Sequence, residues 1–156
     1  MRTAKDGAPL EPESETSPVR IKKAGIPIDP ADFLGKAGTG KTVINLKERE
    51  TVFSRGDLAD AVFYIRKGQV NLTSVSQNGK EATIAQLDAG DFIGEECITP
   101  DHPIRTATAT ALTECKLLKV DRKEILRVLH EEPAFSGLFV SYLLARSTQL
   151  EADLVE

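Results

Sequence analysis

From residue 42 to residue 120, apolar and polar residues alternate in short stretches that turn-forming residues separate. Alternation with a period of two is typical of strands that bury one face. The Asn78-Gly79 pair predicts a tight hairpin in which both central residues have positive φ. Strands of this number and spacing predict a mainly β fold, a small antiparallel barrel or jelly roll. The predicted strands are 42–46, 50–54, 61–65, 69–75, 81–87, 105–112 and 115–120.

After Val120 the pattern becomes helical. Asp121 is expected to cap a helix from Arg122 to His130, and Pro133 to begin a second helix that runs to the end of the chain. The wide apolar face near the start of this second helix favours packing on the barrel. That face consists of Phe135, Leu138, Phe139, Tyr142 and Leu144.

A narrower apolar seam continues along the second helix at spacings of three and four, as in a coiled coil. We expect this seam to form a weak, parallel homodimer, and the alternative is that the whole helix packs on its own barrel. The expected interface residues are Val140, Leu143, Ser147, Leu150 and Leu154. The helical pattern has no stop signal before Glu156, which indicates that it leads into a segment absent from this chain.

The first thirty residues differ in character from the rest. They contain five of the eight prolines, and between Met1 and Lys23 few large aliphatic residues occur. Such a segment buries too little apolar surface to offset its ordering entropy. We therefore expect 1–26 to be a disordered or loosely packed arm, a flexible leader rather than a specific binding arm. The remaining boundaries are 27–132 for the jelly roll, beginning with a short helix capped by Asp29, and 133–156 for the dimerisation helix.

Composition and charge exclude several classes of protein. The chain has 156 residues and a formal net charge of −4, which disfavours nucleic-acid binding on bulk electrostatics. Two cysteines cannot form a disulfide framework or a four-cysteine metal or iron–sulfur site. No apolar run reaches the length of a membrane span, and no signal-peptide pattern opens the chain, so a cytoplasmic protein is expected.

One motif suggests an enzyme. Residues 35–42 match G-x-x-x-x-G-K-[ST], the phosphate loop of nucleotide triphosphatases, with Lys41 as its lysine. That loop must follow a buried strand and open a helix, but here helix signals precede it and a strand pattern follows. Neither His102 nor His130 has a nucleophile or acid partner in a motif. We therefore predict no catalysis, and keep a triphosphatase that uses Lys41 as the rival.

The residues from Gly94 to Thr106 carry the most chemistry. Gly94 permits close approach of the backbone, Glu95 can only accept hydrogen bonds when ionised, and Arg105 offers a planar fork that suits a phosphate. An anion site beside a hydroxyl acceptor at a barrel mouth fits a cyclic nucleotide. The alternative is a structural Glu95–Arg105 ion pair.

From about Ile44 to Val155 the chain resembles the effector domain of the catabolite-activator (Crp–Fnr) superfamily of bacterial transcription regulators. The resemblance implies that Gly94 and Glu95 hold the ribose, Arg105 the cyclic phosphate and Thr106 a further hydrogen bond, with Glu96 and Cys97 completing the ligand set. It implies cyclic AMP or cyclic GMP as effector and no other cofactor. The matching segments are Arg55-Gly-Asp57, Phe63-Tyr-Ile65, Gly68-Gln-Val70, Leu87–Glu95, Arg105-Thr-Ala-Thr108 and the helix after Pro133.

The chain departs from the family pattern in three places. Cyclic-AMP binders usually carry an aliphatic residue where Glu96 stands, and Thr-Ser on the dimer helix where Leu150 and Glu151 fall. No helix-turn-helix pattern follows the dimer helix, so this chain is not expected to bind DNA by itself. A haem-binding version would need axial ligands, and a loop residue such as His102 is more often solvated. A ligand-free dimerisation module of the same family is therefore a further alternative.

Overall fold

The computed structural model describes residues 34, 39–101 and 103–155, with side-chain environments up to residue 146. The predicted arm 1–26, and the short helix expected between it and the first strand, lie outside the described residues except for Leu34. Leu34 is helical and fully buried, so at least this residue packs against the domain.

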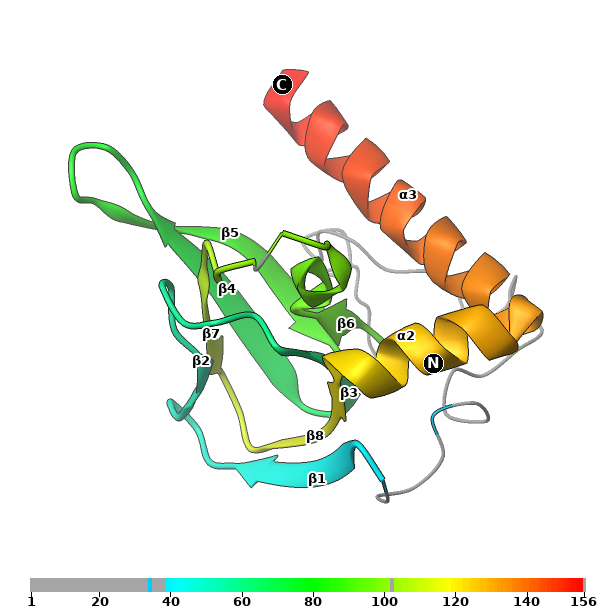
Figure 1. Cartoon of the computed structure of the whole chain (residues 1–156). Helices are drawn as coiled ribbons and strands as arrows, with labels where there is room; N and C mark the ends of the chain where they lie inside the picture. The colour runs from blue at the N-terminus through cyan, green and yellow to red at the C-terminus, as the bar shows by residue number, and fades with distance from the viewer. Residues whose placement is uncertain (1–33, 35–38, 102, 156) are drawn as a thin grey trace, which may run out of the picture.

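Eight strands among the described residues form two separate four-stranded sheets, one of order β1-β8-β3-β6 and the other β2-β7-β4-β5 (Figure 1). All pairings are antiparallel. This is the strand order of a jelly roll, and it confirms the predicted fold class. The strands are β1 (Lys41–Leu46), β2 (Thr51–Phe53), β3 (Ala61–Lys67), β4 (Gln69–Val75), β5 (Glu81–Asp88), β6 (Phe92–Ile93), β7 (Thr108–Ala111) and β8 (Cys115–Asp121).

Two strands differ from the prediction. β6 was not expected, because a strand of two residues is too short to show a period. β7 begins at Thr108 rather than at Arg105. The residues before it pair instead with the loop that follows β2: the Arg105 amide donates to the Asp57 carbonyl at 2.8 Å, and the Gly56 amide donates to the Arg105 carbonyl at 2.8 Å. Arg105 is thereby held in the loop that precedes β7, against the loop that follows β2.

The turn of the hairpin between β4 and β5 differs from the predicted two-residue turn. Asn78 does not have positive φ; only Gly79 does, at 81°. The Gly79 amide donates to the Ser76 carbonyl at 2.9 Å, and the Ser76 amide donates to the Lys80 carbonyl at 2.8 Å. The turn is therefore longer than two residues and places a single glycine in the left-handed region, a common hairpin alternative.

Two apolar clusters hold the domain together. One fills the space between the sheets and includes Phe63, Ile65 and Leu117. The other lies between the β1-β8-β3-β6 sheet and the helices, and its centre is Phe92, whose ring packs edge-on against Phe139 at 5.1 Å between centroids. The second cluster fixes the base of the long helix on the barrel.

The two C-terminal helices are α2 (Arg122–Glu131) and α3 (Pro133–Val155), close to their predicted bounds. Asp121 occupies the N-cap position of α2, but its side chain makes no capping hydrogen bond. In Figure 1, α3 lies beside the barrel at its start and extends past it toward its C-terminal end. The predicted packing face is buried at Phe135, Leu138, Phe139 and Tyr142. The prediction was wrong for Leu144, which lies on the opposite side of the helix and is 64% exposed.

Candidate functional site

The candidate site is the segment from Gly94 to Thr106, here called the cassette. It begins where β6 ends, and continues as the 3-10 turn η3 (Glu95–Ile98). Gly94 has φ 80°, and a Cβ at this position would lie 2.6 Å from Nη1 of Arg105. Glycine is therefore required here both by the backbone conformation and by the close approach of the guanidinium.

Arg105 is the buried cation of the cassette, with only 2% of its surface exposed. Its Nη1 donates to the Gly94 carbonyl at 2.9 Å, and its Nη2 donates to the Ala61 carbonyl at 2.5 Å. The guanidinium also lies over the Phe53 ring, with Cζ 4.1 Å from the ring centroid. Arg105 thus links the cassette to the start of β3 and fixes its own orientation.

The ion-pair partner of Arg105 is Glu96 and not Glu95. Nη1 of Arg105 lies 3.1 Å from Oε2 of Glu96, whose side chain is 35% exposed. The predicted alternative of a Glu95–Arg105 ion pair is therefore wrong, because Arg105 pairs with the neighbouring Glu96. The Nε of Arg105 is buried and has no hydrogen-bond partner among the described residues. A buried guanidinium donor without an acceptor is rare in proteins and requires an explanation.

Glu95 is paired with Arg146 from α3. Nη1 of Arg146 lies 3.0 Å from Oε2 of Glu95, and also donates to the Phe92 carbonyl at 3.0 Å. Burial raises the pKa of Glu95 above its ordinary value, and the Arg146 guanidinium offsets only part of that effect. The cassette carboxylate and the long helix are therefore directly connected.

Arg146 is the site residue that the sequence analysis missed. It is a basic residue one turn after Tyr142, on the face that packs against the barrel. The hydroxyl of Tyr142 donates to the Phe92 carbonyl at 3.0 Å and accepts from the Phe92 amide at 3.0 Å. A charged residue within an otherwise apolar helix face was the available signal, because such a residue needs a buried partner.

Two further residues of the predicted ligand set, Cys97 and Thr106, differ in burial: Cys97 is buried and Thr106 is exposed. The Cys97 side chain is fully buried in the cluster beneath the helices, so it faces the core and not the cassette surface. Burial raises the pKa of its thiol to about 12, which leaves the thiol protonated and unreactive. Only its backbone faces the cassette, where its amide donates to the Gly94 carbonyl at 3.2 Å. Thr106 follows Arg105 and is exposed.

The residues predicted for the dimer seam are only partly described. Val140 is 52% exposed, whereas Leu143 packs partly against the cluster beneath the helices. The side chains of Ser147, Leu150 and Leu154 lie outside the described residues. The exposed apolar positions of α3 that can be placed are thus Val140 and Leu144.

Lys41, the lysine of the phosphate-loop match, begins β1 and does not stand before a helix. Its Nζ lies 3.3 Å from Oε2 of Glu124, which also pairs with Arg127 at 2.6 Å. The strand predicted after the loop is therefore confirmed, and it offers no helix N-terminus for a phosphate.

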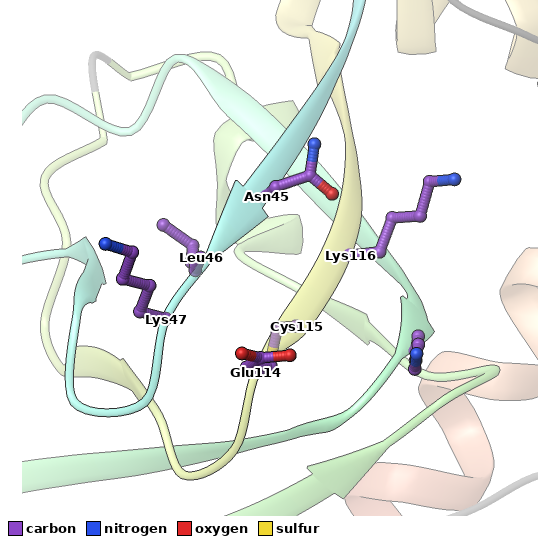
Figure 2. A pocket seen from close by; sticks show the side chains of 7 residues that line it. Asn45, Leu46, Lys47, Glu114, Cys115 and Lys116 are labelled. Atoms are coloured by element: carbon purple, nitrogen blue, oxygen red, sulfur yellow. The ribbon is translucent and has the colours of Figure 1, made fainter.

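A pocket of about 470 Å³ lies away from the cassette, at the end of the barrel where β1, β3 and β8 meet (Figure 2). In Figure 2, Lys47 and Lys116 point to opposite sides of it. None of its lining residues belongs to the predicted ligand set. Among the described residues no group of three or more His, Cys, Asp or Glu is arranged to hold a metal ion. Within the same part of the chain no helix is long and apolar enough to cross a membrane.

Comparison with known proteins agrees with this geometry. Residues 43–132 match the cyclic nucleotide-binding domain family, and the chain belongs to it. It is 28% identical over 107 residues to the cAMP-activated global transcriptional regulator CRP of Salmonella typhimurium, covering 69% of this chain and 50% of that protein. It is 32% identical over 116 residues to the global nitrogen regulator of a Nostoc species, covering 73% and 52%.

The same likeness holds in three dimensions. The catabolite activator protein of Thermus thermophilus superposes with a TM-score of 0.64 at 27% identity, covering 75% of this chain and 55% of that one. The chain therefore has the fold of the effector domain of Crp–Fnr-type transcription regulators. It spans about half the length of the curated relatives that it matches.

Proposed function

We propose that this chain is the small-molecule-sensing domain of a Crp–Fnr-type transcription regulator, and that it binds a cyclic nucleotide without catalysis. Cyclic AMP is the first candidate and cyclic GMP the second. The observation that carries the proposal is the buried guanidinium of Arg105, oriented by two carbonyls and with Nε free of any described acceptor. A cyclic phosphate supplies acceptors for that donor.

The remaining cassette residues have complementary parts in this proposal. Glu95 accepts a hydrogen bond from the ribose hydroxyl, because an ionised carboxylate has no proton to donate. Gly94 lets the ligand approach the backbone, and the exposed Thr106 adds a hydroxyl beside Arg105. Cys97 contributes its backbone alone, since its side chain lies in the core.

We further propose that the ligand signal passes through α3. Arg146 connects this helix to Glu95, so a ribose hydroxyl that binds Glu95 competes with or joins that contact. The exposed Val140 and Leu144 support a homodimer in which α3 of each copy lies against the other. In this proposal, DNA recognition depends on the part of the longer relatives that this chain does not cover. The expected cellular location is the cytoplasm, where transcription is regulated.

Isothermal titration calorimetry against a panel of cyclic nucleotides tests the proposal. Cyclic AMP, cyclic GMP and a cyclic dinucleotide are titrated into the protein, with 5′-AMP as the control for an open-chain phosphate. We expect saturable heat with one cyclic mononucleotide and little with 5′-AMP. The absence of heat with every nucleotide at millimolar concentration would contradict ligand binding.

A ligand-free dimerisation module is the second candidate, and one observation favours it. Glu96 already satisfies part of the hydrogen-bonding capacity of Arg105, so the cation is not vacant. In that case the cassette serves only to hold α3 on the barrel. The same calorimetry separates the two candidates, because a module without a ligand gives no binding heat but still forms a dimer.

A further inference from the structure

We propose that Glu96 acts as an internal anion that occupies Arg105 until a phosphate displaces it, and thereby sets the affinity and the charge preference of the cassette. This inference rests on the proposed function. It gives Glu96, which the resemblance included in the ligand set, a specificity-determining part in which it competes with the nucleotide for Arg105 instead of binding the nucleotide. Its basis is the Glu96–Arg105 contact and the charge balance around it.

The geometry places the two acids of the cassette on different partners. Glu95 turns toward α3 and pairs with Arg146, while Glu96 pairs with Arg105. Nη1 of Arg105 divides its two N–H donors between the Gly94 carbonyl and the Glu96 carboxylate. Among the described residues, Glu96 is the side chain that supplies an acceptor to this buried guanidinium. It can rotate away, because about a third of its side chain is exposed.

The charges of these four side chains cancel. Two carboxylates face two guanidinium groups, and the buried Asp91 is a further acid that interacts electrostatically with Arg146. Arg122 lies at the far end of η3, where its Nε donates to the Cys97 carbonyl at 2.8 Å, and it is not paired with either acid in the described contacts. A cyclic phosphate brings one further negative charge into a cluster in which each of the two guanidinium groups already has an acid partner.

Displacement of Glu96 therefore has an electrostatic cost. A phosphate that binds Nη1 of Arg105 as well as Nε, which is free of any described acceptor, must replace the Glu96 carboxylate on Nη1, and the released carboxylate then lies close to the phosphate. A neutral side chain at this position would leave Arg105 with an uncompensated charge, which favours an anion. The cassette of this chain is consequently set to a weaker affinity for anionic ligands than the same cassette with a neutral residue at position 96.

The test compares Glu96→Gln with the unchanged protein by calorimetry with cyclic AMP. Glutamine keeps the shape and one acceptor of Glu96 but removes its charge. We expect affinity for cyclic AMP to rise about tenfold or more, since each factor of ten corresponds to about 1.4 kcal/mol. Glu96→Leu removes the acceptor as well and should raise affinity at least as much. Thermal melts of each variant verify that it is folded.

Two controls separate charge from structure. Glu48→Gln removes the same charge from an exposed position in the turn between β1 and β2, and should leave the affinity unchanged. Adenosine has the base and the ribose hydroxyls but no phosphate, so the Glu96 variants should gain no affinity for it. An equal gain for adenosine and cyclic AMP would overturn the inference, because the effect would then not depend on the ligand's charge.

The outcomes also distinguish the inference from the proposed function. If the unchanged protein and Glu96→Gln bind cyclic AMP equally well, nucleotide binding stands and the part assigned to Glu96 is wrong. If only Glu96→Gln binds measurably, both are supported, and Glu96 is the reason for the weak binding. If no variant binds any cyclic nucleotide, the proposed function fails and the inference fails with it.

Discussion

Arg146 in α3 and Glu95 in the cassette meet at 3.0 Å, although 51 positions separate them along the chain. The contact is the point at which the long helix reaches the predicted ligand-binding segment. Because Arg146 also donates to the Phe92 carbonyl, it is anchored to β6 as well as to the carboxylate. A change in the protonation or the hydrogen-bond partners of Glu95 therefore alters a contact that fixes α3 on the barrel.

Coupling between Glu95 and Arg146 is the first prediction. Arg146→Met leaves the carboxylate of Glu95 without its partner, and should lower the free energy of unfolding by about 1–3 kcal/mol. Glu95→Gln in the same chain removes the unpaired charge and should restore part of the loss. A double-mutant cycle by urea unfolding measures the coupling, and strictly additive effects would show that the two side chains do not interact.

The second prediction concerns the contribution of Arg105 to cyclic nucleotide binding. Hydrogen bonds that involve a charged partner contribute about 1.5–3 kcal/mol, so Arg105→Ala should weaken cyclic nucleotide binding by roughly a hundredfold. Arg105→Lys should recover little, because an ammonium group cannot reproduce the planar fork. Calorimetry on folded variants measures both, and a lysine variant that binds like the unchanged protein would refute bidentate recognition.

The third prediction concerns acid stability through Glu124. Its hydrogen bonds from Arg127, together with Lys41, lower the pKa of this carboxyl below the ordinary 4.5. The unfolded chain therefore takes up this proton first as the pH falls, so the stabilisation is present above about pH 4.5 and is lost as the pH falls through the lowered folded value.

Glu124→Gln should accordingly show a shallower loss of stability than the unchanged protein as the pH falls below about 4.5. Glu114→Gln, at an exposed position, is the matched control and should keep the original slope. Urea unfolding at a series of pH values measures the effect. Identical slopes for all three proteins would mean that the Glu124 ion pairs do not contribute to acid stability.

Association through α3 is the fourth prediction. The seam covers little more than two heptads with Ser147 at its centre, so we expect a weak homodimer with a dissociation constant in the micromolar range or above. Leu150→Asp should give a folded monomer. Ile84→Asp changes an exposed aliphatic residue on β5 and should leave association unchanged. Analytical ultracentrifugation over a concentration series decides, and a tight dimer in the Leu150 variant would place the interface elsewhere.

Local patterns in the sequence were sufficient for the jelly roll and its two C-terminal helices. Alternation, turn glycines and the proline at the start of α3 depend on backbone geometry that neighbouring residues determine. The cassette could be located for the same reason, since Gly94, Glu95 and Arg105 lie within a short segment. The sequence did not predict the two-residue strand β6 or the shape of the turn at Asn78, because neither feature produces a periodic pattern.

The pairing of charges was decided by the tertiary structure alone. Sequence proximity suggested Glu95 with Arg105, but the fold pairs Glu95 with Arg146 and Glu96 with Arg105. Two adjacent glutamates in a 3-10 turn point in different directions, and which cation each one meets depends on where α3 crosses the barrel. That crossing is fixed by Phe92, Phe139 and Tyr142, residues brought together only by folding. The sequence can indicate that Arg146 needs a buried partner, because it is a charged residue on an apolar helix face, but only the fold determines that this partner is Glu95.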